Sequence, residues 1–274
     1  MNLFSADWPA ICRRVVAAQS RLFEQTPDIA GRTQYEGVGE GGDRSLVIDR
    51  RCEDVIFAEL EQLGASGASF TAISEERGEA AFGEGGPARV VIDPIDGSLN
   101  ARRTLPSHSL SIAVASGGSM ADVEFGYVYD FGAGEEFSAE RGGGARLDGR
   151  RVEVFADGEK LELLGLEAAA PGPVRPLAEA LDGRVFRLRV IGSIAISAAY
   201  VGAGRLDAML SLRPCRSVDI AAAQLIVREA GGALAFGELG LGDAGLGLDA
   251  RFPIAAAAGE KGLATIRNAI EGAV

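Results

Sequence analysis

The sequence has very few of the residues that carry the commonest catalytic and metal-binding chemistry. Its 274 residues include one histidine, His108, and two lysines, Lys160 and Lys261. One imidazole gives little basis for a histidine-based catalytic triad and none for a histidine-rich zinc site. We expect His108, at the start of a predicted strand, to form structural hydrogen bonds. Arginine must supply nearly all of the positive charge.

Cysteine is also sparse, and long apolar runs are absent. Cys12, Cys52 and Cys215 are far apart and form no C-x-x-C pair, so we expect buried, reduced thiols. The mean hydropathy is +0.13 and no apolar run approaches the length of about 18 residues that suggests a membrane span. The first residues, MNLFSADWPAICRRVV, lack the basic start of a secretion signal. We therefore expect a cytoplasmic protein.

Acidic residues are in excess. The chain has 39 acidic and 27 basic side chains, a formal net charge of −12. This balance argues against a general nucleic-acid binder, which needs a basic face. It fits a soluble enzyme and also a protein that gathers divalent cations. Hydrophobic residues make up 47% of the chain, enough for a sizeable core in one large domain or two smaller ones.

Two helices and then a sheet are predicted in the first half. Apolar residues at steps of three and four indicate helices over residues 8–25 and 45–64, separated by a loop at 37–45 rich in glycine and acid. From residue 69 to 155, short apolar segments separated by glycine predict an antiparallel-rich sheet, with a tight Asp-Gly hairpin at Leu147–Arg150.

The second half alternates between strand and helix patterns, which favours a layered α/β arrangement. We place a boundary near residues 155–160. Residues 1–157 then form an α+β half and residues 158–274 an α/β half.

Acidic residues recur at the ends of the predicted elements. They are Glu75 and Glu76 and Asp93 at strand ends, Asp96 in the turn that follows, Asp219 at a helix start and Asp49 within the second helix. Each alone has an ordinary role as a helix cap or a solvated strand end. Together they form the oxygen-only donor set that Mg²⁺ or Mn²⁺ requires.

The segment DPIDGS, residues 93–98, concentrates this chemistry. Pro94 stiffens the turn, and the spacing of the two aspartates lets both point into one cavity. The carbonyl oxygen of Ile95 is a further candidate ligand. If Ser98 or Asn100 begins a helix, its free N–H groups would bind phosphate. Metal-holding carboxylates beside phosphate-holding N–H groups predict metal-assisted hydrolysis of a phosphate ester.

DPIDGS resembles the D-P-[IL]-D-G-[ST] signature of the inositol monophosphatase and fructose-1,6-bisphosphatase superfamily of Mg²⁺-dependent, lithium-sensitive phosphatases. Three further segments resemble the other motifs of that superfamily, in the same order: ISEE at 73–76, VIGSIAISAAYVGAGRLDA at 190–208 and VDIAAAQLIVREAGG at 218–232. The resemblance covers nearly the whole chain. It implies a five-layer αβαβα sandwich, usually a homodimer, with a tetramer as the alternative.

The resemblance also implies the metal ligands. Glu75, Asp93 and the Ile95 carbonyl resemble the ligands of a first metal ion, and Asp93, Asp96 and Asp219 those of a second. A third, weaker ion would contact Glu75 and the loop at 37–45. The implied cofactor is Mg²⁺, with Mn²⁺ as the alternative.

The same comparison implies the catalytic and phosphate-binding groups. Ser98, with Asp49 behind it, would orient the attacking water and help to remove its proton, with Glu75 as the third member of the catalytic set. The segment Asp96-Gly97-Ser98 would hold the phosphate. No covalent enzyme intermediate is required.

The substrate end differs from enzymes that act on inositol phosphates alone. Val218 replaces the tryptophan of the W-D motif, and MLSLRPCRS has no acid where eukaryotic inositol monophosphatases carry a substrate-binding glutamate. The chain is more similar to the archaeal dual-specificity enzymes, which bind the substrate with two arginines and an apolar residue. Arg189, Arg213 and Ile194 fall at the matching places. Gly192 and Ser193, which precede Ile194, are further candidates for binding the substrate. Forked arginine donors suit the second phosphate of a bisphosphate.

We therefore expect a Mg²⁺-dependent hydrolase of fructose-1,6-bisphosphate, inositol-1-phosphate or both, acting by water attack. One alternative is a phosphatase for 3′-phosphoadenosine-5′-phosphate or NADP, although aromatic residues are only 6% of the chain and form no obvious stacking cluster. Another is an inactive metal-binding regulator, although every acid that the superfamily needs is present. The expected partners are a small phosphate ester and a second copy of the chain, without nucleic acid or membrane.

Overall fold

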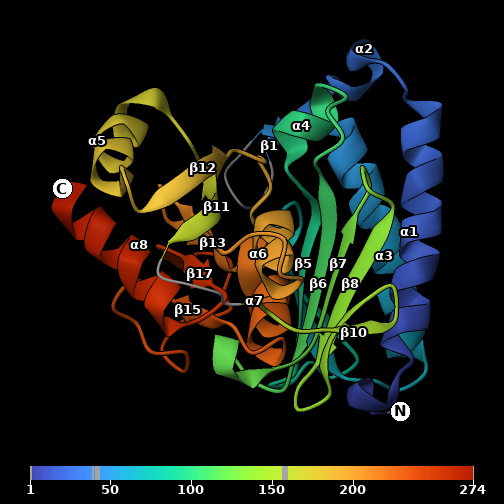
Figure 1. The fold of residues 1–274 in the computed structure, drawn as a ribbon. Coiled ribbons are helices and arrows are strands. Elements are labelled where there is room, and N and C mark those ends of the chain that lie inside the picture. Colours follow the sequence, from blue (N-terminus) through green and yellow to red (C-terminus); the bar gives the residue numbers. More distant parts are fainter. Residues whose placement is uncertain (1, 39, 41–43, 156–159, 274) are drawn as a thin grey trace.

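The computed structural model describes residues 2–38, 40, 44–155 and 160–273. Two sheets lie within five alternating layers of helix and strand (Figure 1). The helices are α1 (Trp8–Gln25), α2 (Ile29–Arg32), α3 (Val47–Ala65), α4 (Ser98–Arg102), α5 (Pro171–Leu181), α6 (Ile194–Gly202), α7 (Ser217–Glu229) and α8 (Glu260–Ala273). Helices α1 and α3 cover one face of the larger sheet, α6 and α7 lie between the sheets, and α5 and α8 cover the smaller sheet. The predicted αβαβα sandwich is confirmed.

The larger sheet has eight strands in the order β10-β9-β8-β7-β6-β5-β3-β4. They are β3 (Phe70–Ser74), β4 (Gly78–Phe82), β5 (Arg89–Asp96), β6 (Ser109–Ala115), β7 (Val123–Asp130), β8 (Glu135–Glu140), β9 (Gly144–Leu147) and β10 (Arg150–Val152). Only β3 and β5 pair in parallel among these neighbours, so the antiparallel-rich prediction is confirmed. The hairpin is confirmed as well, since Leu147 pairs with Arg150 across Asp148 and Gly149, both at positive φ.

The smaller sheet has five strands in the order β12-β11-β13-β17-β15. They are β11 (Leu161–Glu167), β12 (Val185–Arg189), β13 (Ala208–Ser211), β15 (Ala233–Ala235) and β17 (Ala255–Ala257). Strand β11 is parallel to both neighbours, and the other pairs are antiparallel. The predicted boundary between residues 157 and 158 lies outside the described residues; β10 ends before it and β11 begins after it.

Two small strand pairs stand apart from these sheets. They are β1 (Tyr35–Val38) with β2 (Arg44–Leu46), and β14 (Cys215–Arg216) with β16 (Arg251–Phe252). The first pair corrects the prediction of a plain loop at 37–45, because the two ends of that segment pair as antiparallel strands; residues 39 and 41–43 are not described. Short 3₁₀ turns, η1 (Leu3–Ser5) and η2 (Met120–Asp122), complete the elements.

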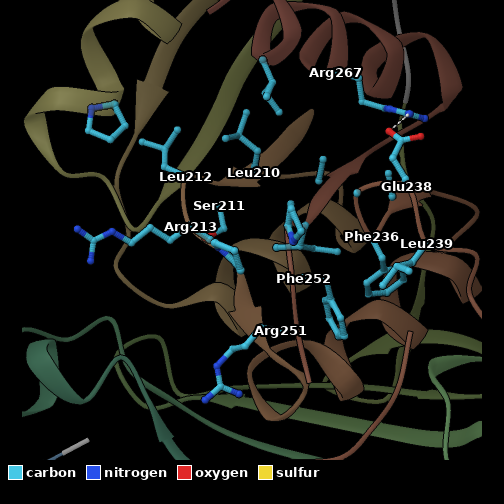
Figure 2. Close-up of a pocket in the computed structure, with 18 of the residues that line it drawn as sticks. Leu210, Ser211, Leu212, Arg213, Phe236, Glu238, Leu239, Arg251, Phe252 and Arg267 are labelled. Carbon is cyan, nitrogen blue, oxygen red and sulfur yellow. Dashed lines mark hydrogen bonds and ion pairs between the residues drawn. The ribbon is translucent and has the colours of Figure 1, made fainter. Parts of the chain in front are cut away.

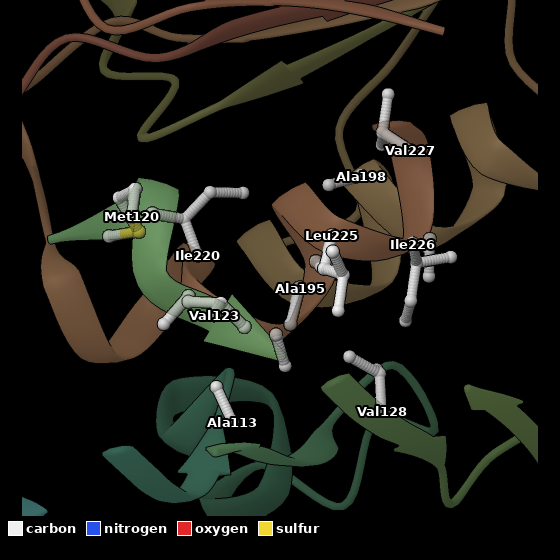
Figure 3. Close-up of a cluster of buried hydrophobic side chains, with 14 of the residues drawn as sticks. Ala113, Met120, Val123, Val128, Ala195, Ala198, Ile220, Leu225, Ile226 and Val227 are labelled. Atoms are coloured by element: carbon white, nitrogen blue, oxygen red, sulfur yellow. The ribbon is translucent and has the colours of Figure 1, made fainter. Parts of the chain in front are cut away.

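Helix α7 is the centre of the fold. All of its first 11 residues, from Ser217 to Val227, are buried. Figure 3 shows Ile220, Leu225 and Ile226 packed among alanines of α6 and apolar side chains of the larger sheet. Because its N-terminus carries Asp219, this packing holds one of the predicted metal ligands in a fixed place.

Two predictions about isolated residues hold. The cysteines are buried and free. His108 is buried, its Nδ1 lies 3.2 Å from the carbonyl oxygen of Leu105, and its ring packs against Phe23 and Phe131. Within the described ranges, no helix combines the length and the apolar character that crossing a bilayer would take.

The close approach of α7 to β7 depends on Gly126. A Cβ at this position would lie 2.5 Å from the carbonyl oxygen of Ala222, a main-chain atom in the middle of α7. Gly126→Ala should therefore lower the free energy of unfolding by about 1–3 kcal/mol, as overpacking does. Gly118→Ala is the matched control, because a Cβ there meets nothing within 4 Å. Urea denaturation measures both, and equal losses would contradict this account of the packing.

Candidate active site

The segment 93–98 lies at an irregularity of the larger sheet. On the pairing of β5 with β6, Asp93 faces Ser111 and Asp96 faces Ser109. Strand β5 therefore advances three residues while β6 advances two, which is a β-bulge with one extra residue. In a regular strand, residues three apart point to opposite faces. The extra residue brings the Asp93 and Asp96 carboxyl groups to the same face, and both are buried.

Hydrogen bonds fix both carboxyl groups. Asp93 Oδ1 accepts the N–H of Ile95 at 3.0 Å. Asp96 Oδ2 accepts the N–H of Ala195 at 2.7 Å and a short bond from the hydroxyl of Ser193. Ser193 is the N-cap of α6 and accepts the N–H of Ile196. Asp96 thus connects the larger sheet to the first turn of α6.

Glu75 and Asp219 come to the same place from different elements. Glu75 follows β3, whose last residue pairs with Ile92, the residue before Asp93. Asp219 lies in the first turn of α7 and accepts the N–H of Arg216 at 2.8 Å. The Arg216 guanidinium lies 2.6 Å from Glu75 Oε1 and 3.4 Å from Asp219 Oδ1.

Burial, and after it repulsion between neighbouring acids, raises the pKa of Glu75, Asp93 and Asp96. Burial raises the pKa of Glu75 to about 8, with Asp219 and Glu76 adding to the effect and Arg216 opposing it. Burial, and next the Asp219 charge, raises the pKa of Asp96 to about 7. Burial also raises the pKa of Asp93 well above its usual range, with repulsion from Glu75, Asp96 and Asp219. Such a cluster gains strongly from a cation.

The donor set fits a hard divalent cation. Glu75, Asp93, Asp96 and Asp219 offer only oxygen, the ligand type of Mg²⁺ and Mn²⁺. In the part of the chain that the structure describes, no three acidic, histidine or cysteine side chains already form a finished metal-ligand set. Two of the acids are engaged by Arg216 and one by Ser193. The chemistry of the site therefore fits the ion, and its side chains would need to adjust to hold it.

The predicted catalytic pair is only partly assembled. Asp49 is buried in the first turn of α3, and burial, followed by the Glu76 charge, raises its pKa to about 7. Ser98 begins α4 and is exposed. No hydrogen bond joins Ser98 to Asp49 among the interactions of the described residues. Glu40, in the described part of the 37–45 segment, donates its N–H to the Glu76 carbonyl at 3.2 Å, so this segment reaches the acids.

Gly97 is required where it stands. It caps α4 with a φ of 84°, in the left-handed region that favours glycine. A Cβ would also lie 3.0 Å from the carbonyl oxygens of Gly192 and Ser107. The main chain of Asp96-Gly97-Ser98, which is predicted to hold the phosphate, therefore lies close to the main chain of Gly192, which is predicted to bind the substrate.

A cavity of about 690 Å³ opens beside Asp96. Three of the residues predicted to bind substrate, Gly192, Ile194 and Arg213, line it. Ser193 is buried beneath it against Asp96. Arg189 is exposed and is not one of the lining residues; its guanidinium donates to the Leu188 carbonyl at 2.9 Å.

A second cavity, of about 590 Å³, lies between α5, α8 and β16. Its walls are largely apolar and include Leu210, Phe236 and Phe252 (Figure 2). None of its lining residues in the described chain belongs to the acid cluster. Arg213 borders both cavities, and its side chain extends away from this one (Figure 2).

Two buried glutamates that sequence reasoning missed support the site. Glu53 accepts the Arg77 N–H at 3.1 Å and a short bond from the Ser74 hydroxyl, which fixes the turn that carries Glu75. Glu167 accepts the Gly192 N–H at 2.8 Å and the Ser197 hydroxyl at 2.5 Å. Glu167 ends an apolar strand, as Asp96 does, so its pattern could have revealed it. Glu53 lies within a helix and gives no such signal. The prediction that the strand of Asp93 ends at that residue is wrong, because β5 continues through the bulge to Asp96.

Sequence reasoning also missed Arg216 as a residue of the site. Its spacing of three residues from Asp219 is typical of a side chain that interacts across a helix start. Its contact with Glu75, however, joins positions 141 residues apart (216 − 75) and cannot be read from the sequence.

Comparison with known proteins identifies the family. The model of the inositol monophosphatase family matches residues 15–269. The chain is 34% identical over 260 residues to the fructose-1,6-bisphosphatase/inositol-1-monophosphatase of Methanothermobacter thermautotrophicus, with 91% of each chain covered. It is 36% identical over 201 residues to the inositol-1-monophosphatase of Mesorhizobium japonicum, covering 70% of this chain and 71% of that one. It is 36% identical over 219 residues to Nus factor SuhB of Salmonella typhimurium, covering 76% of each.

Solved structures agree on the fold. An inositol monophosphatase–fructose 1,6-bisphosphatase superposes with a TM-score of 0.81 at 24% identity, covering 96% of this chain and 100% of that one. The extragenic suppressor protein SuhB of Bartonella henselae superposes with a TM-score of 0.79 at 26% identity, covering 97% and 99%. The resemblance seen in the four motifs is confirmed: the chain belongs to the inositol monophosphatase family and is a phosphoric monoester hydrolase.

Proposed function

We propose that this hydrolase acts on fructose-1,6-bisphosphate and inositol-1-phosphate, with Mg²⁺ as cofactor and Mn²⁺ as the alternative. The observation that carries the proposal is the β-bulge, which turns Asp93 and Asp96 to one face beside Glu75 and Asp219, next to a cavity bordered by Arg213. The curated relatives named for both activities support the pair of substrates.

The acids have distinct roles in this proposal. Glu75, Asp93 and the Ile95 carbonyl would hold a first cation, and Asp93, Asp96 and Asp219 a second. Bound divalent cations would neutralise the ester and lower the pKa of a coordinated water. The 37–45 segment, through Glu40, lies close enough to the acids to support a third, weaker ion.

The remaining groups would position the reactants. Asp49, whose pKa is raised to about 7 by burial, suits proton removal near neutral pH and would act with Ser98 on the attacking water. The main chain of Asp96-Gly97-Ser98 would hold the phosphate that is cleaved. Arg213 would bind the second phosphate of a bisphosphate. The proposal for Arg189 rests on the family resemblance alone.

The two halves of the chain would act together. Residues 1–157 carry Glu75 and the 93–98 segment, while residues 158–274 carry the substrate segment and Asp219. The bonds from Ser193 and Ala195 to Asp96 support one centre formed by both halves. We also propose a homodimer, with a tetramer as the alternative, because Leu99, Leu105 and Val190 are exposed apolar side chains at the edge of the cavity. The cytoplasm remains the proposed location.

Nucleotide phosphates are the second substrate candidate, and the cavity beside Asp96 gives them little support. An adenine ring is usually held by aromatic stacking, as in other base-binding sites. The described residues that line this cavity include no phenylalanine, tyrosine or tryptophan. The aromatic pair Phe236 and Phe252 lies in the other cavity, away from the acids.

Asp93→Asn should abolish Mg²⁺-dependent phosphate release from inositol-1-phosphate, because it removes a charged ligand shared by both proposed ions. Phosphate release and melting temperature should be measured together. Asp182→Asn, at an exposed position in the other half, is the matched control and should behave as wild type. An active Asp93→Asn enzyme would refute the assignment, and a wild type that binds Mg²⁺ but releases phosphate from none of the candidate substrates, nucleotides included, would favour the metal-binding regulator.

Fructose-1,6-bisphosphate and inositol-1-phosphate should be cleaved at comparable rates. Arg213→Ala should raise KM for the bisphosphate by about 10-fold or more, the size expected for one charge-assisted contact, and affect inositol-1-phosphate much less. Steady-state kinetics on both substrates measure this. Activity on inositol-1-phosphate alone would remove the role of Arg213, and activity on neither would turn attention to nucleotide substrates.

Without divalent cations, stability should fall as pH rises. Folding raises the pKa of Asp96 from 3.8 to about 7 and that of Glu75 from 4.5 to about 8. Each raised pKa stabilises the folded state below the ordinary value, and this contribution is lost as pH rises through the raised value. The melting temperature in EDTA should therefore be lower at pH 8 than at pH 5, and Mg²⁺ should restore it at pH 8. A melting temperature in EDTA that rises over this range would show that the acids do not interact in this way.

A further inference from the structure

Arg216 lies among the acids of the active site. Its Nη1 is 2.6 Å from Glu75 Oε1 and its Nε is 3.4 Å from Asp219 Oδ1. The side chains are mostly enclosed, with exposed fractions of 18% for Arg216, 15% for Glu75 and 10% for Asp219. The positive charge of Arg216 also reaches Asp93, whose carboxylate form it favours. One arginine therefore interacts with three of the four acids.

The main chain around Arg216 is held firmly. Arg216 pairs with Arg251, and Cys215 with Phe252, in the β14–β16 ladder. On the other side, Arg216 is the N-cap of α7 and donates its N–H to Asp219. The next residue, Ser217, donates its hydroxyl to the carbonyl oxygens of Leu246 and Gly247. The guanidinium is thus presented to the acids from a fixed backbone.

We propose that Arg216 is a positioning residue that sets the affinity of this centre for divalent cations, acting as a permanent counter-charge to the acids. It stabilises the acid cluster in the absence of a divalent ion and weakens the binding of that ion. The inference rests on the proposed function, because it takes the acids to be the ligands of Mg²⁺.

The direction of the effect of Arg216 on cation affinity follows from the charges. When ionised, Glu75, Asp93, Asp96 and Asp219 attract a divalent ion, and a fixed positive charge beside Glu75 and Asp219 opposes it. Arginine does not lose its proton at any pH that a folded protein tolerates, so the opposing charge stays when the ion arrives. The effect is only weakly screened by salt, because the groups are largely enclosed.

Two substitutions separate charge from shape. Arg216→Gln removes the charge and keeps hydrogen-bonding capacity, while Arg216→Lys keeps the charge and loses the forked geometry. Mg²⁺ binding to metal-free, full-length protein should be measured by isothermal titration calorimetry at fixed pH and ionic strength, together with melting temperatures in EDTA and in Mg²⁺. Arg216→Gln should bind Mg²⁺ about 10-fold more tightly, melt lower in EDTA and gain more from Mg²⁺ than wild type. Arg216→Lys should bind Mg²⁺ within about 2-fold of wild type.

Arg205→Gln is the matched control. Arg205 forms a forked ion pair with Glu135 at 2.5 and 2.7 Å, and the groups that act on it do not include the active-site acids. Its loss should lower the melting temperature without changing the affinity for Mg²⁺. If Arg216→Gln does not fold, Arg216→Met takes its place, because methionine is neutral and of similar length. This variant should also bind Mg²⁺ more tightly than wild type.

The proposal is overturned if Arg216→Gln binds Mg²⁺ as wild type does or more weakly, since Arg216 would then only orient the ligands. It is also overturned if Arg216→Lys matches Arg216→Gln, because the charge would not be the cause. The failure of the proposed function looks different: wild type would bind no Mg²⁺ at all.

Discussion

Repulsion among buried carboxylates is the constraint on which the rest of the site depends. Glu75, Asp93, Asp96 and Asp219 are brought together where little water can screen them, and buried charges of one sign are stable only with donors or cations at hand. The fold provides donors to Asp93, Asp96 and Asp219 from the main chain, and Glu75 receives the Arg216 guanidinium. These contacts reduce the repulsion without removing it, which is the condition for binding a cation strongly.

The same acids connect the larger sheet to the helices that lie between the two sheets. Asp96 belongs to the larger sheet and is bound at the start of α6, while Asp219 starts α7, the helix buried between the sheets. The N-terminus of a helix carries a partial positive charge, so two helix starts directed at the acids favour their ionised forms. Packing of α7 through Gly126 and its buried apolar side chains therefore serves both the core and the position of a proposed metal ligand. A core substitution there is expected to affect the acids as well.

Much of this arrangement could be predicted from the sequence, and the limits have physical causes. The helix at 8–25 has the predicted bounds because its apolar period is regular and Asp7 caps it. Strand β4, Gly78–Phe82, was not predicted because GEAAF has little apolar alternation and forms by pairing with β3. The acids could be found because each follows an apolar run or lies in the first turn of a helix. Glu53 and the Arg216–Glu75 contact could not, since they depend on which elements the tertiary fold places side by side. The exposed position of Arg189 could not be predicted either, because it also depends on the tertiary fold.

The choice of arginine as the basic residue has a consequence for how this centre responds to its surroundings. With one histidine and two lysines in the chain, the groups near the acids that can change charge around neutral pH are the acids themselves. If the acids hold a divalent cation as proposed, protons and that cation would compete for the same oxygens, while the charge of Arg216 stays constant. Raising pH strengthens the attraction for a cation and weakens the metal-free fold through one set of groups. We therefore expect rising pH to lower the stability of the metal-free protein and to raise its affinity for a divalent cation, both through the burial and repulsion of the same carboxylates.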